Sequence, residues 1–314
     1  MWSACTSGVR FAILLVLVLG CSQPSPVSKQ TDSPETQTIV TTSVALAEVA
    51  TRLNSGTIPV LNVIPEDKLS PDWRPRKASV RSLQQATLVL LNGAGWEPWT
   101  ERVSLATSRT LETSAAASSR WIQIPDAVTH QHGPEGSHSH AGTVWSTWLS
   151  PELFEVQIAE VESRFVKNWP ERRTETNRAA GQLRSELQPA RLLCQTTREH
   201  VSGTKFSIVA DSPCWLYLMR DTGLEGSWLH WPASGELSEF ALKELTTAND
   251  KLPADVPKLF LLNRRQSAAS EKARQLGFRV VLLDDCILAD SEQSVIQRIS
   301  ANVTQLHKAT TEAF

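Results

Sequence analysis

The sequence predicts an α/β protein with two lobes, each built on a parallel sheet, and a long backbone helix that joins them. Short apolar segments of strand length alternate with helical segments in the first half of the chain. The same alternation begins again near Phe206, and a long helical stretch rich in Arg and Glu lies between the two sets. Strands that alternate with helices are typical of parallel sheets, so the repeated set predicts a second lobe.

The chain begins with the pattern of a secretory signal over residues 1–20. The apolar run from Phe11 to Leu19 is too short to span a bilayer, but it fits the hydrophobic region of such a signal. Gly20 and Cys21 follow, a small residue and then Cys, as in bacterial lipoprotein signals. We therefore expect the mature chain to start at Cys21, to carry lipid there and to be anchored to a membrane outside the cytoplasm, on the periplasmic side. The sequence leaves open whether this is an inner or an outer membrane.

A flexible tether over residues 21–37 and an N-terminal lobe over residues 38–168 are expected next. Ser, Pro, Thr and Gln dominate the tether, as they do in flexible linkers. The elements predicted for the lobe are a strand over 38–42, a helix over 44–53, a strand over 58–64, a helix over 83–87, a strand over 88–91, and a helix that starts at Pro151. Ser150 is a suitable cap for this last helix, and Pro fits its first turn.

A linking helix over residues 169–202 and a C-terminal lobe over residues 203–314 complete the prediction. The linking helix has a thin apolar stripe of Ala180, Leu183 and Leu187, and Pro189 is expected to kink or end it. The elements predicted for the second lobe are strands over 206–210, 259–262 and 278–283, a helix that stops at Gly277, and a final helix from about residue 291.

Composition excludes several classes of function. The net charge of −2 offers no basic surface for nucleic acid. The sequence contains no Gly-x-Ser-x-Gly elbow, no phosphate-binding loop and no His-Glu-x-x-His motif, so we expect no enzyme. Eleven Trp residues stand against one Tyr, and we expect most of them to fill the core, because Trp is usually buried.

A histidine-rich segment over residues 130–142 is the first candidate metal site. It carries two His-x-His pairs, His130 with His132 and His138 with His140, and it lacks the apolar periodicity of a packed element. Such tracts in exported proteins commonly bind metal, and flexible ligands lose entropy on binding, so we expect a surface loop that binds metal weakly.

Cysteine use is sparse after the signal. Cys194, Cys214 and Cys286 remain, and an oxidising compartment allows one disulfide among them with one thiol left over. The sequence does not assign the pair.

Several fragments together resemble the zinc- and manganese-binding solute-binding lipoproteins of ABC importers, which have the TroA-like fold. The fragments are Leu90-Leu91-Asn92-Gly93-Ala94-Gly95-Trp96-Glu97-Pro98-Trp99, Trp148-Leu149-Ser150-Pro151, Asp221-Thr222-Gly223-Leu224-Glu225 and Val281-Leu282-Leu283-Asp284. The resemblance covers nearly all of the mature chain. It implies a monomer that binds zinc, or another divalent cation such as manganese, between its lobes and delivers it to the permease and ATPase subunits of an importer.

The resemblance also implies a ligand set of three His and one carboxylate, and this chain departs from it. The first His position falls on Pro71 with Asp72 beside it, the second on Ser146, and the third on Ser212 with Asp211 beside it. The final carboxylate falls on Asp284, which is the cleft ligand that we expect.

Two alternatives follow from these replacements. A shift of one residue would bring in Asp72 or Asp211, and with Asp284 and Asp285 these would make an oxygen-rich site for harder cations. Alternatively, the chain is a binding-protein scaffold without a cleft metal site, which buffers metal, serves as an interaction lipoprotein or binds another small ligand.

Cys214 and Cys286 each lie two residues beyond a ligand position, so a disulfide between them is expected near the cleft.

Overall fold

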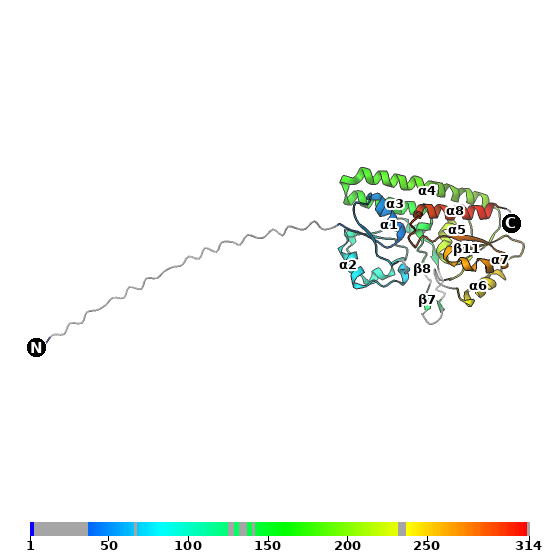
Figure 1. Cartoon of the computed structure of the whole chain (residues 1–314), viewed down its shortest axis with the longest axis horizontal. Coiled ribbons are helices and arrows are strands. Elements are labelled where there is room, and N and C mark those ends of the chain that lie inside the picture. Colours follow the sequence, from blue (N-terminus) through cyan, green and yellow to red (C-terminus); the bar gives the residue numbers. More distant parts are fainter. Residues whose placement is uncertain are drawn as a thin grey trace. The chain divides into compact units, whose positions relative to one another are not determined.

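Two four-stranded parallel sheets form the framework of the computed structural model, which describes residues 1–2, 37–65, 68–124, 129–131, 137–139, 142–231 and 237–312 (Figure 1). Residues 37–314 form one compact unit, and residues 1–36 are separate from it. Cys21, and with it almost all of the predicted signal and tether, lies outside the described residues. Among the described residues, no helix is both long enough and apolar enough to cross a bilayer.

The first sheet has the strand order β2-β1-β3-β4. Its elements, with the helices that connect them, are β1 (Ile39–Thr41), α1 (Val44–Leu53), β2 (Val60–Asn62), α2 (Lys77–Gln85), β3 (Leu88–Leu91) and β4 (Thr110–Glu112). Val40 is paired with Leu61 on one side and with Val89 on the other. The Ser43 hydroxyl accepts a hydrogen bond from the Leu46 amide at 3.2 Å and so begins α1.

The second sheet has the strand order β10-β9-β11-β12. Its elements are β9 (Ser207–Ala210), α5 (Leu216–Asp221), β10 (Ser227–Trp228), α6 (Glu239–Asn249), β11 (Lys258–Asn263), α7 (Ser270–Gln275) and β12 (Arg279–Leu283). Both sheets are parallel, so the predicted α/β class with two parallel sheets is confirmed.

Shorter elements connect these parts. Two antiparallel pairs are β5 (Gln123–Ile124) with β8 (Gly142–Thr143) and β6 (Thr129–Gln131) with β7 (Ser137–Ser139). The 3₁₀ turns are η1 (Ser70–Asp72), η2 (Pro98–Arg102), η3 (Thr107–Arg109), η4 (Ala115–Arg120), η6 (Thr147–Leu149), η7 (Pro170–Arg172), η8 (Pro213–Trp215) and η9 (Arg264–Ala269).

Three long helices pack together along both sheets: α3 (Pro151–Asn168), α4 (Arg173–Val201) and α8 (Val295–Thr311), as Figure 1 shows. The helix α4 continues through Pro189, so the expectation that this proline could end it is wrong. Leu187 and Ala190 are buried on either side of Pro189, and this packing outweighs the loss of one backbone hydrogen bond.

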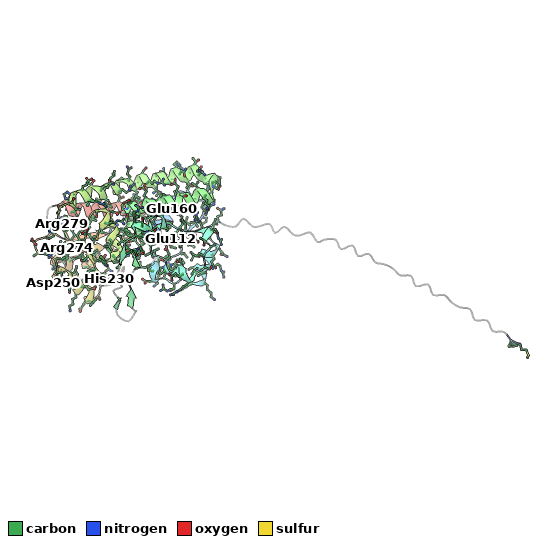
Figure 2. The ribbon with its side chains drawn as sticks, turned by 180° about the vertical axis from the view of Figure 1, so that it is seen from behind. Glu112, Glu160, His230, Asp250, Arg274 and Arg279 are labelled. Carbon is green, nitrogen blue, oxygen red and sulfur yellow. The ribbon has the colours of Figure 1, made fainter. Side chains whose placement is uncertain are left out.

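The core is shared by both halves of the unit. One cluster of buried side chains contains Leu46 from α1, Leu183 from α4, Leu261 from β11 and Ile299 from α8. Charged side chains lie on the outside of both halves, for example Glu112, which ends β4, and Arg274 in α7 (Figure 2). The two sheets are therefore held by one continuous apolar core.

The tryptophans are mostly core residues, as predicted. Trp96, Trp99, Trp148 and Trp231 are buried. Trp96 and Trp148 meet edge to face with ring centroids 5.1 Å apart. Such aromatic pairs contribute beyond their buried area, so these rings stabilise the junction of β3 with the segment before α3.

Glu97 ties the ends of two strands of the first sheet together. Its buried carboxylate accepts hydrogen bonds from the Thr42 hydroxyl and from the amides of Asn92 and Gly93, at 2.7 and 2.9 Å for the two amides. Burial raises the pKa of Glu97 to about 7, against the lowering effect of these hydrogen bonds.

We expect Glu97→Gln to change how stability depends on pH. Between pH 4.5 and about 7 the unfolded chain has released a proton that folded Glu97 still holds. The free energy of unfolding therefore falls as the pH rises, and Glu97 accounts for a decline of about 3 kcal/mol. Urea unfolding at several pH values should show that Glu97→Gln loses this part of the decline, whereas Glu101→Gln, at an exposed neighbour, keeps it. The same pH dependence in Glu97→Gln and the parent chain would contradict this assignment.

Candidate functional site

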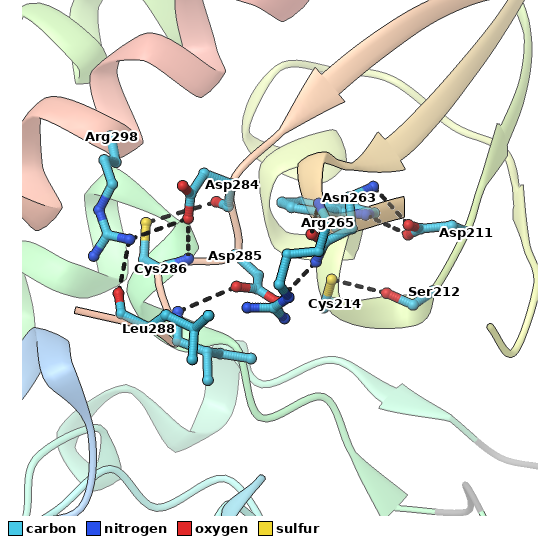
Figure 3. Close-up of polar contacts among 12 residues, drawn as sticks. Asp211, Ser212, Cys214, Asn263, Arg265, Asp284, Asp285, Cys286, Leu288 and Arg298 are labelled. Carbon is cyan, nitrogen blue, oxygen red and sulfur yellow. Dashed lines mark hydrogen bonds and ion pairs between the residues drawn. The ribbon is translucent and has the colours of Figure 1, made fainter. Parts of the chain in front are cut away.

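Polar side chains gather at the carboxyl edge of the second sheet (Figure 3). Asp211 follows β9, Asn263 ends β11 and Arg265 follows it, and Asp284 and Asp285 follow β12. Parallel strands end at the same edge, which is where ligands bind in open α/β sheets. The sequence prediction placed candidate ligands at this edge, but it did not consider Asn263 or Arg265.

Asp285 is buried and fully engaged by neighbouring donors. It forms an ion pair with Arg265, and one of its oxygens also accepts a hydrogen bond from the Asn263 side-chain amide at 2.8 Å. The other oxygen accepts a hydrogen bond from the Ile287 amide at 3.2 Å. Burial raises the pKa of Asp285, while the positive charge of Arg265 acts in the opposite direction.

Asp211 is the second buried carboxylate at this edge. Its two oxygens accept hydrogen bonds from the Trp215 indole at 2.7 Å and from the Asn263 backbone amide at 2.6 Å. Burial raises the pKa of Asp211 to about 6, and the negative charge of Asp285 adds to this effect. Asn263 therefore donates to both buried carboxylates and holds them at fixed positions.

Asp284, the expected cleft ligand, is also paired with a cation. Its Oδ1 lies 3.2 Å from the guanidinium of the buried Arg298 and accepts a hydrogen bond from the Cys286 amide at 2.7 Å. Cys286 has a φ of +58°, in the left-handed region that non-glycine residues seldom adopt. This turn directs the chain so that both carboxylates after β12 meet donors. The role of Asp284 as a ligand stays a prediction.

The other candidate ligands have different surroundings. Ser146 is buried, and its hydroxyl donates to the Cys214 carbonyl at 2.6 Å, so it reaches the second sheet's edge from the segment before α3. The Ser212 hydroxyl donates to the Cys214 sulfur at 2.8 Å. Asp72 lies at the end of η1 in the first half and is exposed. The structure thus brings Ser146 near Ser212, both through Cys214.

Within the described ranges, no three His, Cys, Asp or Glu side chains are grouped so that they could hold a metal ion. A small cavity of about 170 Å³ lies nearby, between the ends of β1 and β2 and the loop after β12. Thr42, Asn62, Trp96, Trp148 and Ile287 line it, and none of its lining residues is a His, Cys, Asp or Glu. The donors that are present do not match a zinc site, which takes four N, S or O ligands in tetrahedral geometry.

The histidine-rich segment contains a short hairpin rather than only a loop. The strands β6 and β7 are antiparallel, and their register places His130 opposite His138. His132 and His140 lie outside the described residues.

The expected disulfide is wrong. Cys194, Cys214 and Cys286, the three cysteines that the structure describes, are free and buried. Burial raises the pKa of Cys194 to about 12, and it also raises the pKa values of Cys214 and Cys286. Position near the same sheet edge does not ensure pairing, since a disulfide requires specific Cα distances and directions.

Arg265 and Arg298 are the residues of the candidate site that the sequence did not predict; they pair with Asp285 and Asp284. Arg265 stands two residues after a buried strand whose parallel neighbours are followed by carboxylates, and this position was a usable signal. Arg298 lies in the final helix, and nothing in its local sequence points to Asp284.

Comparison with known proteins gives a consistent family. The family described as "ZnuA: Zinc-uptake complex component A periplasmic" matches residues 39–309. The high-affinity zinc uptake system protein ZnuA of Bacillus subtilis (strain 168) is 23% identical over 218 residues, which cover 68% of this chain and 67% of that protein. The manganese ABC transporter substrate-binding lipoprotein PsaA of Streptococcus pneumoniae is 19% identical over 292 residues, 90% of each chain. For a relative from Treponema pallidum (strain Nichols), 26% identical over 150 residues, the chain spans 46% of its length.

Solved structures share the fold. The binding protein FpvC from Pseudomonas aeruginosa in complex with Mn²⁺ has a TM-score of 0.65 and 19% identity, over 87% of this chain and 98% of that one. Zn(II)-bound AdcA from Streptococcus pneumoniae has a TM-score of 0.65 and 18% identity, over 88% of this chain and 58% of that one. At these identities the likeness shows the TroA-like fold with its long helix, as the sequence predicted.

We expect the three described thiols to be inert in the folded protein and all to react once it unfolds. Only the thiolate reacts readily, and these thiols are buried with raised pKa values. Mass spectrometry of a Cys21→Ser chain without its signal, alkylated at pH 8 without reductant, should show no adducts when folded and three in urea. Fewer than three adducts in urea would show that two of the cysteines are paired.

Proposed function

The chain belongs to the family of periplasmic zinc-uptake components, and from this premise we propose that it captures zinc outside the cytoplasm for an ABC importer. The family consists of metal-binding substrate-binding proteins for transport and not of enzymes. In this chain, we propose, the histidine-rich segment is the part that binds the metal.

The observation that carries this proposal is the register of the β6–β7 hairpin. His130 and His138 occupy directly opposite positions of an antiparallel ladder, so their Cα atoms are neighbours across the two strands. His132 and His140 each follow two residues later in the sequence, so the segment offers four imidazoles in all. Imidazole suits zinc, and four donors satisfy its preferred coordination.

Anchoring and partners form part of the same proposal. Cys21 would carry the lipid, and residues 21–37 would tether the two lobes, residues 38–168 and 203–314, to the membrane on its periplasmic side. The linking helix over residues 169–202 would join the lobes of a monomer. The permease and ATPase subunits of the importer would be its partners, as expected for this family.

A second candidate is favoured by the ion pairs at the sheet edge. Asp284 is paired with Arg298 and Asp285 with Arg265, so the carboxylates nearest the expected cleft site already have cations. A scaffold of this kind would buffer metal through the histidine segment, and its cleft would hold another small ligand or none. The two candidates differ in whether zinc accumulation by cells depends on the chain.

We expect metal binding to depend on the histidine segment. A Cys21→Ser chain without its signal, dialysed against zinc, should hold about one ion, because zinc takes four ligands. Removal of residues 130–140 should reduce this to background, as measured by metal analysis and titration calorimetry. The matched control replaces His200 and His307, which lie in α4 and α8, and should leave the count unchanged.

The same shortened chain tests the cleft. Zinc that stays bound after removal of residues 130–140, and that is lost on a further Asp284→Ala substitution, would contradict the proposal and return the metal site to the sheet edge. Equal background binding with and without Asp284→Ala supports it.

A further inference from the structure

We propose that Arg265 is a built-in cation of the cleft, which occupies the place beside Asp285 that a divalent ion would need and so excludes metal from the sheet edge. This inference deepens the proposed function. It rests on that function only in taking the carboxyl edge of the second sheet as the place where relatives would bind their metal. It assigns to Arg265 a role in specificity. Because the guanidinium of Arg265 neutralises the negative charge at the sheet edge, metal binds at the histidine segment instead.

The charges at the edge support this role. Asp211 and Asp285 are both buried and close enough for the charge of one to raise the pKa of the other. Two buried carboxylates without a counter-charge would be strongly destabilising. Arg265 supplies that charge through its ion pair with Asp285, and its charge also acts on the neighbouring Cys214 thiol. A divalent ion at the same place would meet both the repulsion of the guanidinium and occupied carboxylate oxygens.

The position of Arg265 is built and not accidental. Asn263 begins the turn η9 by accepting a hydrogen bond from the Arg265 amide at 3.0 Å. The same Asn263 donates to Asp285 through its side chain and to Asp211 through its backbone. Asn263 therefore determines both the backbone turn that carries Arg265 and the orientation of the two carboxylates. Figure 3 shows Arg265 among these partners.

The oxygen atoms around the guanidinium are the ligand atoms that a metal cation would use if Arg265 were absent. Each Asp285 oxygen accepts a hydrogen bond, and the one that bonds Arg265 would lose its only charged partner. Asp211, Ser212 and the Cys214 sulfur lie in the same network. Carboxylate and hydroxyl oxygens favour harder ions, so Mn²⁺ is the suitable probe.

The test measures whether Mn²⁺ can replace the lost charge. The parent is the Cys21→Ser chain without its signal, in which His130, His132, His138 and His140 are replaced by Ser, so that the segment cannot bind the probe. In this background Arg265→Ala should lower the melting temperature by about 10 °C, because it leaves a buried carboxylate unpaired. Millimolar Mn²⁺ should recover most of this loss and leave the parent unchanged.

Two controls separate this role from a general loss of an ion pair. Arg265→Lys keeps a cation near Asp285 and should show no Mn²⁺ effect. Arg184→Ala breaks an ion pair with Glu162, between α4 and α3, and should be destabilised without recovery by Mn²⁺.

The proposal would be overturned if Mn²⁺ left the melting temperature of Arg265→Ala unchanged. It would also be overturned if Mn²⁺ stabilised the parent as much as the variant. If Arg265→Ala does not fold without metal, the folded yield with and without Mn²⁺ becomes the measurement, and equal yields overturn it. These results do not depend on the histidines, so failure of the histidine segment to bind zinc is a separate outcome.

Discussion

The packing of one helix against both halves of the protein is the constraint on which the rest depends. The helix α4 has 29 residues, which corresponds to about 43 Å of length, and it contacts α1, α3 and α8. Its buried residues Ala180, Leu187 and Cys194 belong to the same apolar cluster as residues of both sheets. Because this cluster is continuous, the carboxyl edges of the two sheets are held at fixed positions. The polar side chains at those edges are then held in defined positions.

The two sheet edges differ in the groups that compensate the charge of their carboxylates. In the first half, Glu97 has no ion pair and accepts hydrogen bonds from one hydroxyl and two amides, and burial raises its pKa against the lowering effect of these bonds. In the second half, Asp211 is also held by hydrogen bonds, whereas Asp285 is paired with Arg265 and Asp284 with Arg298. A buried charge requires hydrogen bonds, a counter-ion or a proton, and this chain uses all three. The carboxylates at the two edges therefore have partners from the chain itself before any ligand arrives.

Fold and site chemistry are thus separable in this protein. The fold is that of metal-binding proteins of ABC importers, and the family match covers nearly the whole unit. The positions at which the resemblance implied imidazole ligands carry Pro71, Ser146 and Ser212 instead. Function belongs to sites and not to folds, so the shared fold does not by itself assign the metal site of this chain. The hairpin in which His130 lies opposite His138 is the segment that we propose for the metal.

The sequence by itself determined the fold class, the alternation of strands and helices, and the long linking helix, because apolar periodicity and capping residues are local signals. It also indicated that the tryptophans would be buried and that imidazoles were missing from the expected cleft. Only the tertiary structure decided that Arg265 pairs with Asp285, that Arg298 pairs with Asp284 and that the three described thiols are free. It also decided that α4 passes through Pro189. These contacts join residues distant in the chain or depend on packing from other elements, and their geometry exists only after the elements have assembled.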